Sequence, residues 1–174
     1  MTADSLTSKF ILLILLVFLL HACGFQLRGQ ADLPSALAVT YIDVNQSANV
    51  PPSELAQALK RALVSNGNMV VDDPQTATAT LKILGESQAR RTIATGPQGD
   101  VREYELNYVV AYNVTLADGS ILMPKDTIRI TRDVLYAESQ VLGREAGEEI
   151  IKRDMISDAA FSIIRRLQAI RQSS

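Results

Sequence analysis

One stretch largely determines the fold of this chain: Tyr104-Glu-Leu-Asn-Tyr-Val-Val-Ala-Tyr-Asn-Val-Thr-Leu116. Every second residue along it is apolar. Successive side chains of a β-strand point to opposite faces, so such alternation is typical of a strand with one face buried. The sequence therefore predicts a long strand with one face in the core. That face carries Tyr104, Leu106, Tyr108, Val110, Tyr112, Val114 and Leu116.

Further strands are predicted on both sides of this stretch. They cover Leu37 to Val44, Met69 to Val71, Ala77 to Ser87 and about Asp126 to Tyr136, where β-branched and apolar residues dominate or alternate. Asp118-Gly119 is a tight-turn signal, although Ser120 to Pro124 is expected to lengthen that connection. The glycines and proline within Arg90 to Gly99 predict an exposed and mobile hairpin loop.

Two helices are predicted. The first follows Pro51-Pro52, begins after Ser53 as N-cap and runs to about Ser65, where Asn66-Gly67 is a helix stop. The second runs from Arg144 to about Arg171, with glutamates near its start and arginines near its end, as the helix dipole favours. Its apolar stripe is Ile151, Met155, Ala159, Ile163, Leu167 and Ile170. The simplest interpretation of this stripe is a face packed on a sheet, while a surface for a partner helix or a bilayer is the alternative.

Together these elements predict an α+β fold, a two-layer sandwich in which two helices pack on one face of a mostly antiparallel four- to five-stranded sheet. We expect residues 37–171 to form this single domain. Residues 23–36 are expected to be an N-terminal tether, and residues 1–22 are expected to lie outside the domain.

The first 22 residues resemble a bacterial lipoprotein signal peptide. Lys9 precedes the apolar run Phe10 to Leu20, and Leu20-His21-Ala22-Cys23 would be the lipobox that makes Cys23 the lipidated mature N-terminus. The run has 11 residues, whereas a membrane-spanning helix needs about 20. Its length suits the apolar region of a signal peptide. An ordinary secretory signal and a buried structural cysteine are the alternatives.

Composition excludes several kinds of chemistry. Removing 22 of the 174 residues leaves 152 without any histidine, because His21 is the only one. That excludes a Ser-His-Asp triad and histidine-ligated zinc in the mature chain. The sequence contains no Gly-rich phosphate loop and no metal-ligand cluster, so we expect no enzyme activity, cofactor or metal. A net charge of −2 gives no support for nucleic-acid binding.

The whole pattern resembles a known family. Cys23-Gly-Phe-Gln-Leu-Arg-Gly29 is similar to the mature N-terminus of the lipopolysaccharide-assembly lipoprotein family LptE. Three further stretches agree in order: Arg102-Glu-Tyr-Glu-Leu106, Leu142-Gly-Arg-Glu145 and Ile163-Ile-Arg-Arg-Leu167.

The resemblance implies a protein anchored in the periplasmic leaflet of the Gram-negative outer membrane. It further implies that the protein plugs and helps assemble the LptD β-barrel, binds lipopolysaccharide and helps insert it into the outer leaflet. Two other functions stay open: a lipoprotein that carries a lipid across the periplasm, and a pilotin-type lipoprotein that escorts another pore.

Lipid A carries phosphates, which an arginine fork binds bidentately. The candidates are Arg90, Arg91 and Arg102 beside the predicted loop, and Arg144, which matches a basic position of the family motif. The alternative for each is a solvated surface charge.

Overall fold

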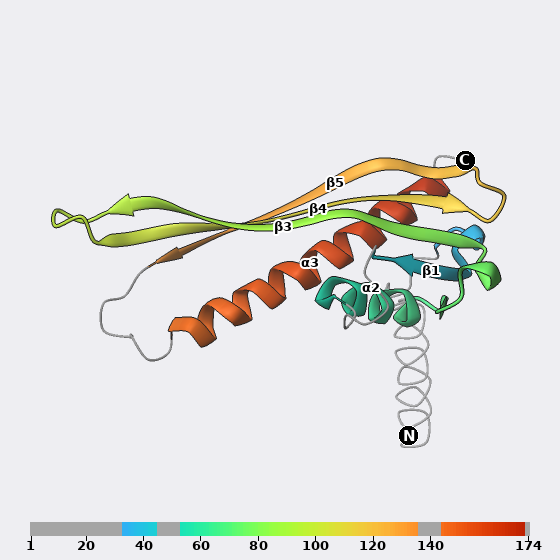
Figure 1. Ribbon diagram of the computed structural model, residues 1–174, viewed down its shortest axis with the longest axis horizontal. Coiled ribbons are helices and arrows are strands. Elements are labelled where there is room, and N and C mark those ends of the chain that lie inside the picture. The colour runs from blue at the N-terminus through green and yellow to red at the C-terminus, as the bar shows by residue number, and fades with distance from the viewer. Residues whose placement is uncertain (1–32, 45–52, 136–143, 173–174) are drawn as a thin grey trace, which may run out of the picture. The chain divides into compact units, whose positions relative to one another are not determined.

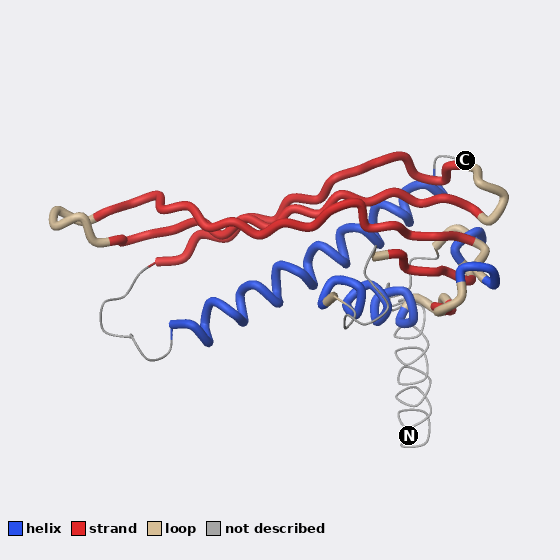
Figure 2. Tube along the Cα trace, viewed as in Figure 1, coloured by secondary structure: helices blue, strands red, loops and turns tan. Residues whose placement is uncertain are grey.

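The computed structural model describes residues 33–44, 53–135 and 144–172, all within the unit Ala31–Ser174. Five strands form one sheet in the order β2-β1-β3-β4-β5. Two helices, α2 and α3, lie on the same side of this sheet (Figure 1). The predicted α+β fold is therefore confirmed. The tube in Figure 2 shows the two layers, with the strands on one side and the helices on the other.

The centre of the sheet is β4 (Val101–Leu116), the strand predicted from the alternating stretch. It pairs antiparallel with β3 (Ala79–Thr95) on one side and with β5 (Ile121–Leu135) on the other. Its even-numbered residues from Tyr104 to Val114 are buried beneath the helices. The faces are therefore named inner, toward the helices, and outer.

The prediction of a loop over Arg90 to Gly99 is wrong for most of this range. β3 continues to Thr95, and only a short turn, closed by Gly96 N–H donating to the Asp100 carbonyl at 2.8 Å, joins it to β4. Gly99 in this turn has φ of +82°, a left-handed conformation that favours glycine. Backbone pairing with β4 keeps this part of β3 extended, although its side chains are mostly exposed.

The connection between β4 and β5 is also shorter than predicted. Asp118-Gly119 makes the turn, and β5 begins at Ile121, so Ser120 to Pro124 does not form a long loop. Pro124 lacks a backbone N–H and is tolerated in strands at edges and bulges. It lies on the outermost strand, where the β4–β5 register shifts.

The strands β1 (Val39–Asp43) and β2 (Met69–Val71) pair in parallel, and β1 also pairs in parallel with β3. β1 is shorter than the predicted strand because Ser35–Leu37 forms a 3-10 helix, η1. A second 3-10 helix, η2 (Pro74–Thr76), precedes β3.

The helix α2 (Glu54–Ser65) connects β1 to β2. As predicted, Ser53 caps it: the Ser53 hydroxyl oxygen accepts a hydrogen bond from the Ala56 N–H at 3.1 Å. The helix ends at Asn66 and Gly67, whose φ is +83°.

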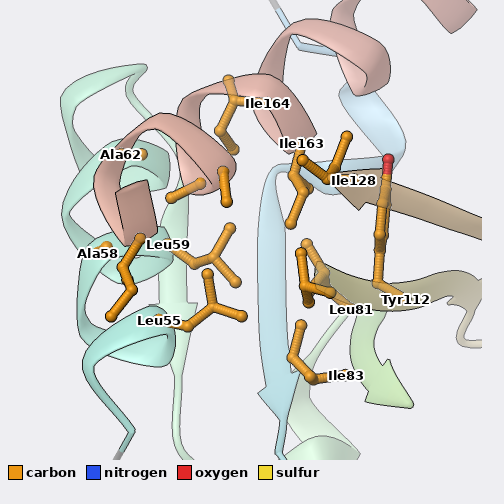
Figure 3. Packing of buried hydrophobic residues seen from close by; sticks show 14 of the residues in the cluster. Leu55, Ala58, Leu59, Ala62, Leu81, Ile83, Tyr112, Ile128, Ile163 and Ile164 are labelled. Atoms are coloured by element: carbon orange, nitrogen blue, oxygen red, sulfur yellow. The ribbon is translucent and has the colours of Figure 1, made fainter. Parts of the chain in front are cut away.

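The helix α3 (Arg144–Gln172) packs on β4, β5 and α2. Its predicted apolar stripe lies in the core, with Met155, Ala159, Ile163 and Leu167 all buried. Figure 3 shows side chains of α2 and α3 pointing toward those of the sheet, including Leu81, Tyr112 and Ile128. The C-terminal half of α3 is also held to β5 by Arg166, whose guanidinium binds the Asp126 carboxylate.

Candidate functional site

The far part of the β3–β4 hairpin faces the N-terminal half of α3, and a carboxylate joins them. Glu148 of α3 accepts a hydrogen bond from the Tyr104 hydroxyl at 3.3 Å and lies 3.4 Å from Nη1 of Arg90. Its other oxygen lies 3.0 Å from Lys152 Nζ, one helical turn later. Three elements therefore meet at one side chain that is 16% exposed.

The electrostatics of Glu148 follow from these contacts. Burial raises the pKa of its carboxyl group, but Lys152, Arg90 and Tyr104 together outweigh burial and hold that pKa below its ordinary value. Glu148 is therefore ionised at neutral pH. The sequence predicted for Glu148 only a favourable interaction with the helix dipole.

Arg90 lies on the inner face. It pairs with the backbone position of Leu106, and its guanidinium carbon lies 4.1 Å from the centroid of the Tyr104 ring. A cation above an aromatic face is stabilised by the ring's electron density. Arg90 is thus held by a ring and a carboxylate, while its side chain remains 44% exposed.

Arg91, the next residue, lies on the outer face. Its Nη2 donates to Glu105 Oε1 at 3.1 Å, and the same oxygen accepts from Asn107 Nδ2 at 2.7 Å. These two hydrogen bonds hold the pKa of Glu105 below its ordinary value. Thr131 of β5 donates to Asn107, which extends the network across three strands. The sheet therefore separates Arg90 from Arg91.

Arg102 lies beside the β3–β4 turn, with Nε 2.6 Å from Asp100 Oδ2. A Cβ at Gly96 would lie 2.5 Å from Asp100 Oδ1 and 2.7 Å from Arg102 Nε, so any larger residue there would force these two side chains to move. Arg144 is the first residue of α3, one turn before Glu148, and its side chain lies outside the described residues. Cys23 also lies outside them.

A cavity of about 300 Å³ lies beside the Glu148 cluster. Its wall comes from three segments: Gln88 to Arg90 of β3, Leu106 to Tyr108 of β4, and Glu148, Lys152 and Met155 of α3. The alternating pattern predicted Tyr104, Leu106 and Tyr108 only as core residues. The Glu148–Lys152 spacing of four residues was the one available signal for a cluster on α3.

Two other kinds of site are absent from the described part of the chain. It contains no group of three or more acidic, cysteine or histidine side chains arranged to bind a metal. None of its helices has the length and apolar character that crossing a bilayer requires.

Comparisons with known proteins agree with this fold. The sequence profile of the LptE family, described as lipopolysaccharide-assembly, matches residues 37–167. The LPS-assembly lipoprotein LptE of Photorhabdus laumondii is 27% identical over 160 residues, which cover 92% of this chain and 85% of that protein. LptE of Pectobacterium atrosepticum is 25% identical over 165 residues, covering 91% of this chain and 84% of that one.

Solved structures of lipoproteins have the same fold. The solution structure of an uncharacterised lipoprotein B from Nitrosomonas europaea matches with a TM-score of 0.69 and 29% identity, covering 86% of this chain and 93% of that one. Rare lipoprotein B from Shewanella oneidensis matches with a TM-score of 0.65 and 24% identity, covering 78% and 97%. The family profile matches most of the chain, and the family's role is assembly rather than catalysis. This chain belongs to the LptE family of lipopolysaccharide-assembly proteins.

Proposed function

We propose that this chain is the lipid-anchored subunit of the outer-membrane machinery that inserts lipopolysaccharide, and that its partner is an LptD-type β-barrel which it plugs and helps assemble. The observation that carries the proposal is the family match over residues 37–167. The lipobox-like Leu20-His21-Ala22-Cys23 in front of it supports the anchor.

The partner is tested by purification of the tagged chain from outer membranes. The expected result is a stable complex with one large β-barrel protein. Recovery with a secretin would support the pilotin function, and recovery without a barrel would contradict the proposal. A lipid carrier is disfavoured by the described residues, because the two cavities among them, of about 300 and 320 Å³, are at the lower limit for a small ligand and cannot enclose several acyl chains.

Cys23 is proposed as the anchor. Buried acyl chain contributes about 0.8 kcal/mol per methylene, and stable anchoring takes more than one chain. We expect Cys23→Ala to abolish incorporation of radiolabelled palmitate and to release the protein from membranes that lack the barrel. Ser35→Ala, a change in η1 outside the lipobox, is the control and should leave labelling intact. Labelling that persists in Cys23→Ala would refute the site.

The arginines are proposed as contacts to lipopolysaccharide phosphates, with a division that follows from the fold. Arg90 and Arg144 belong to the side of the sheet that α3 covers, and Arg102 lies at the turn nearby. Arg91 is on the outer face, so one lipid headgroup cannot bind Arg90 and Arg91 together. We therefore assign the contact to Arg90, Arg102 and Arg144.

This division is tested with glutamine variants, which remove charge and keep a polar side chain. Binding of lipopolysaccharide by the Arg90→Gln, Arg144→Gln double variant should weaken and lose part of its salt dependence. Arg91→Gln, one residue away on the opposite face, is the matched control and should bind as the unmodified protein does. Unchanged binding in the double variant would remove Arg90 and Arg144 from the site.

A further inference from the structure

The cavity beside Glu148 has an apolar floor and a polar rim. Leu106, Tyr108 and Met155 are each at least 96% buried, since their exposed fractions are 4%, 1% and 2%. Gln88 and Arg90 of β3 and Lys152 of α3 form part of the rim. Polar groups around an apolar floor are the usual composition of a small-ligand site.

One polar atom of this wall lacks a well-formed hydrogen bond. The Tyr108 hydroxyl is buried and makes no hydrogen bond of good geometry to any described residue, although the Glu86 carboxylate lies close enough to interact with it. A buried hydroxyl without a partner is costly, so native proteins rarely keep one unless a water molecule or a ligand satisfies it. Burial raises the pKa of Tyr108, and the nearby Glu86 carboxylate raises it further. The Tyr108 hydroxyl therefore stays protonated and can donate or accept.

Tyr112 provides the contrast. It lies on the same strand, four residues later and on the same face, and it is equally buried, at 0% exposed. Its hydroxyl donates to Asp126 Oδ2 at 3.2 Å. The fold thus gives the Tyr112 hydroxyl a well-formed hydrogen bond, whereas the Tyr108 hydroxyl has only the nearby Glu86 carboxylate, without a hydrogen bond of good geometry.

Charge around the cavity does not favour an anion. Arg90 and Lys152 are both paired with Glu148, and the carboxylates of Glu86 and Glu54 act on Tyr108. These carboxylates offset the two cations, so an anionic group gains little by entering the cavity. The phosphate contact proposed for Arg90 therefore uses the exposed part of that side chain, outside the cavity. A ligand hydroxyl suits Tyr108 and Glu86 better, because it can accept from one and donate to the other.

We propose that this cavity binds one uncharged sugar ring of lipopolysaccharide, with a ring hydroxyl bonded to Tyr108 and the apolar face of the ring on Leu106 and Met155. The proposal rests on the proposed function, since it names the part of lipopolysaccharide that this site receives. Cavities for small ligands begin at about 300 Å³, which this one just reaches. It therefore suits one ring and excludes a whole lipid.

The test uses the mature lipidated protein in detergent and two probes: the free core oligosaccharide released from lipopolysaccharide, and lipid A without core sugars. Affinities are measured by calorimetry for the unmodified protein, Tyr108→Phe and Tyr112→Phe. One lost hydrogen bond lowers affinity by roughly 3–10-fold. We expect that loss for the oligosaccharide in Tyr108→Phe alone, with lipid A binding unchanged in both variants.

Thermal unfolding without ligand is the second measurement. Tyr108→Phe removes a hydroxyl without a well-formed hydrogen bond, so its melting temperature should stay equal or rise. Tyr112→Phe removes a satisfied one, so its melting temperature should fall.

Three results separate the possible failures. The sugar site would be overturned if the oligosaccharide bound Tyr108→Phe as tightly as the unmodified protein, or did not bind at all. In either case the proposed function would stand, provided that lipid A still binds and the barrel still co-purifies. A fall in stability for Tyr108→Phe would show that the hydroxyl is already satisfied, by a water molecule for example, and would also overturn it. Loss of both lipid A binding and the barrel complex would instead contradict the proposed function.

Discussion

Glu148 offers the sharpest test of how α3 is held against the β3–β4 hairpin. The change Glu148→Gln keeps the shape of the side chain and removes its charge. It weakens two ion pairs, to Arg90 and Lys152, whose side chains are 44% and 35% exposed, and one hydrogen bond from the buried Tyr104.

The magnitude follows from those exposures. Ion pairs to partly exposed partners contribute about 0.2–1 kcal/mol each, and a hydrogen bond to a charged group contributes about 1.5 kcal/mol. The free energy of unfolding at pH 7 should therefore fall by about 2 kcal/mol. For a domain of this size that lowers the melting temperature by about 4–8 °C.

The pH dependence has a definite sign. The pKa of Glu148 is lowered in the folded protein, so its contribution is present above the ordinary value of about 4.3 and is lost as the pH falls through the lowered one. Urea unfolding is followed by circular dichroism from pH 7 down to pH 3 for the unmodified protein and the variant. The stability gap between them should be full at pH 7 and should close in the acid range.

Glu149→Gln is the matched control. Glu149 is 48% exposed and pairs with Arg153 on its own helix, with 3.5 Å between the paired atoms, so the loss for Glu149→Gln should be below about 0.5 kcal/mol. Equal losses for the two variants, or a gap for Glu148→Gln that does not narrow between pH 7 and pH 3, would refute the role assigned to Glu148.

Two further changes test local structure. Ser53→Ala removes the cap of α2 and should lower the free energy of unfolding by about 1 kcal/mol, measured by urea unfolding; no change would contradict the cap. Gly96→Ala places a Cβ 2.5 Å from Asp100 Oδ1, so the amides of the β3–β4 turn should exchange hydrogen faster, while Gly85→Ala, whose Cβ meets nothing within 4 Å, should leave that turn unaffected. Identical exchange at the turn in both would contradict the close approach.

The sequence predicted those strands and helices in which burial of one face imposes a regular spacing of apolar residues. Alternation over 104–116 is enough to predict β4, because its inner face is packed and its outer face is not. The stripe from Ile151 to Ile170 predicts α3 for the same reason. Ser53 and Gly67 mark the ends of α2 through local hydrogen bonding and backbone conformation.

The length of β3 escaped prediction for a physical reason. Residues 84–95 are mostly exposed. They carry no apolar alternation, so only pairing with β4, distant in sequence, keeps them extended. Gly96, Pro97 and Gly99, which suggested a long loop, belong to a short turn over residues 96–100.

The cluster around Glu148 could not be assembled from the sequence. Four arginines could be named from the sequence, but their faces could not, since the face of Arg90 and Arg91 depends on the register of β3 with β4. Glu148 and Tyr104 were missed because their roles arise from a contact between residues 44 positions apart. The lack of a well-formed hydrogen bond at the Tyr108 hydroxyl is likewise a property of packing.

We propose that lipopolysaccharide contacts the inner side of the β3–β4 hairpin beside α3. A photocrosslinking amino acid placed at Gln88, which lines the cavity, or at Ser87, which faces the other way, tests it in living cells. Both residues are exposed and adjacent. We expect a crosslink to lipopolysaccharide from position 88 and none from position 87. Crosslinking from position 87 alone, or equally from both, would contradict it.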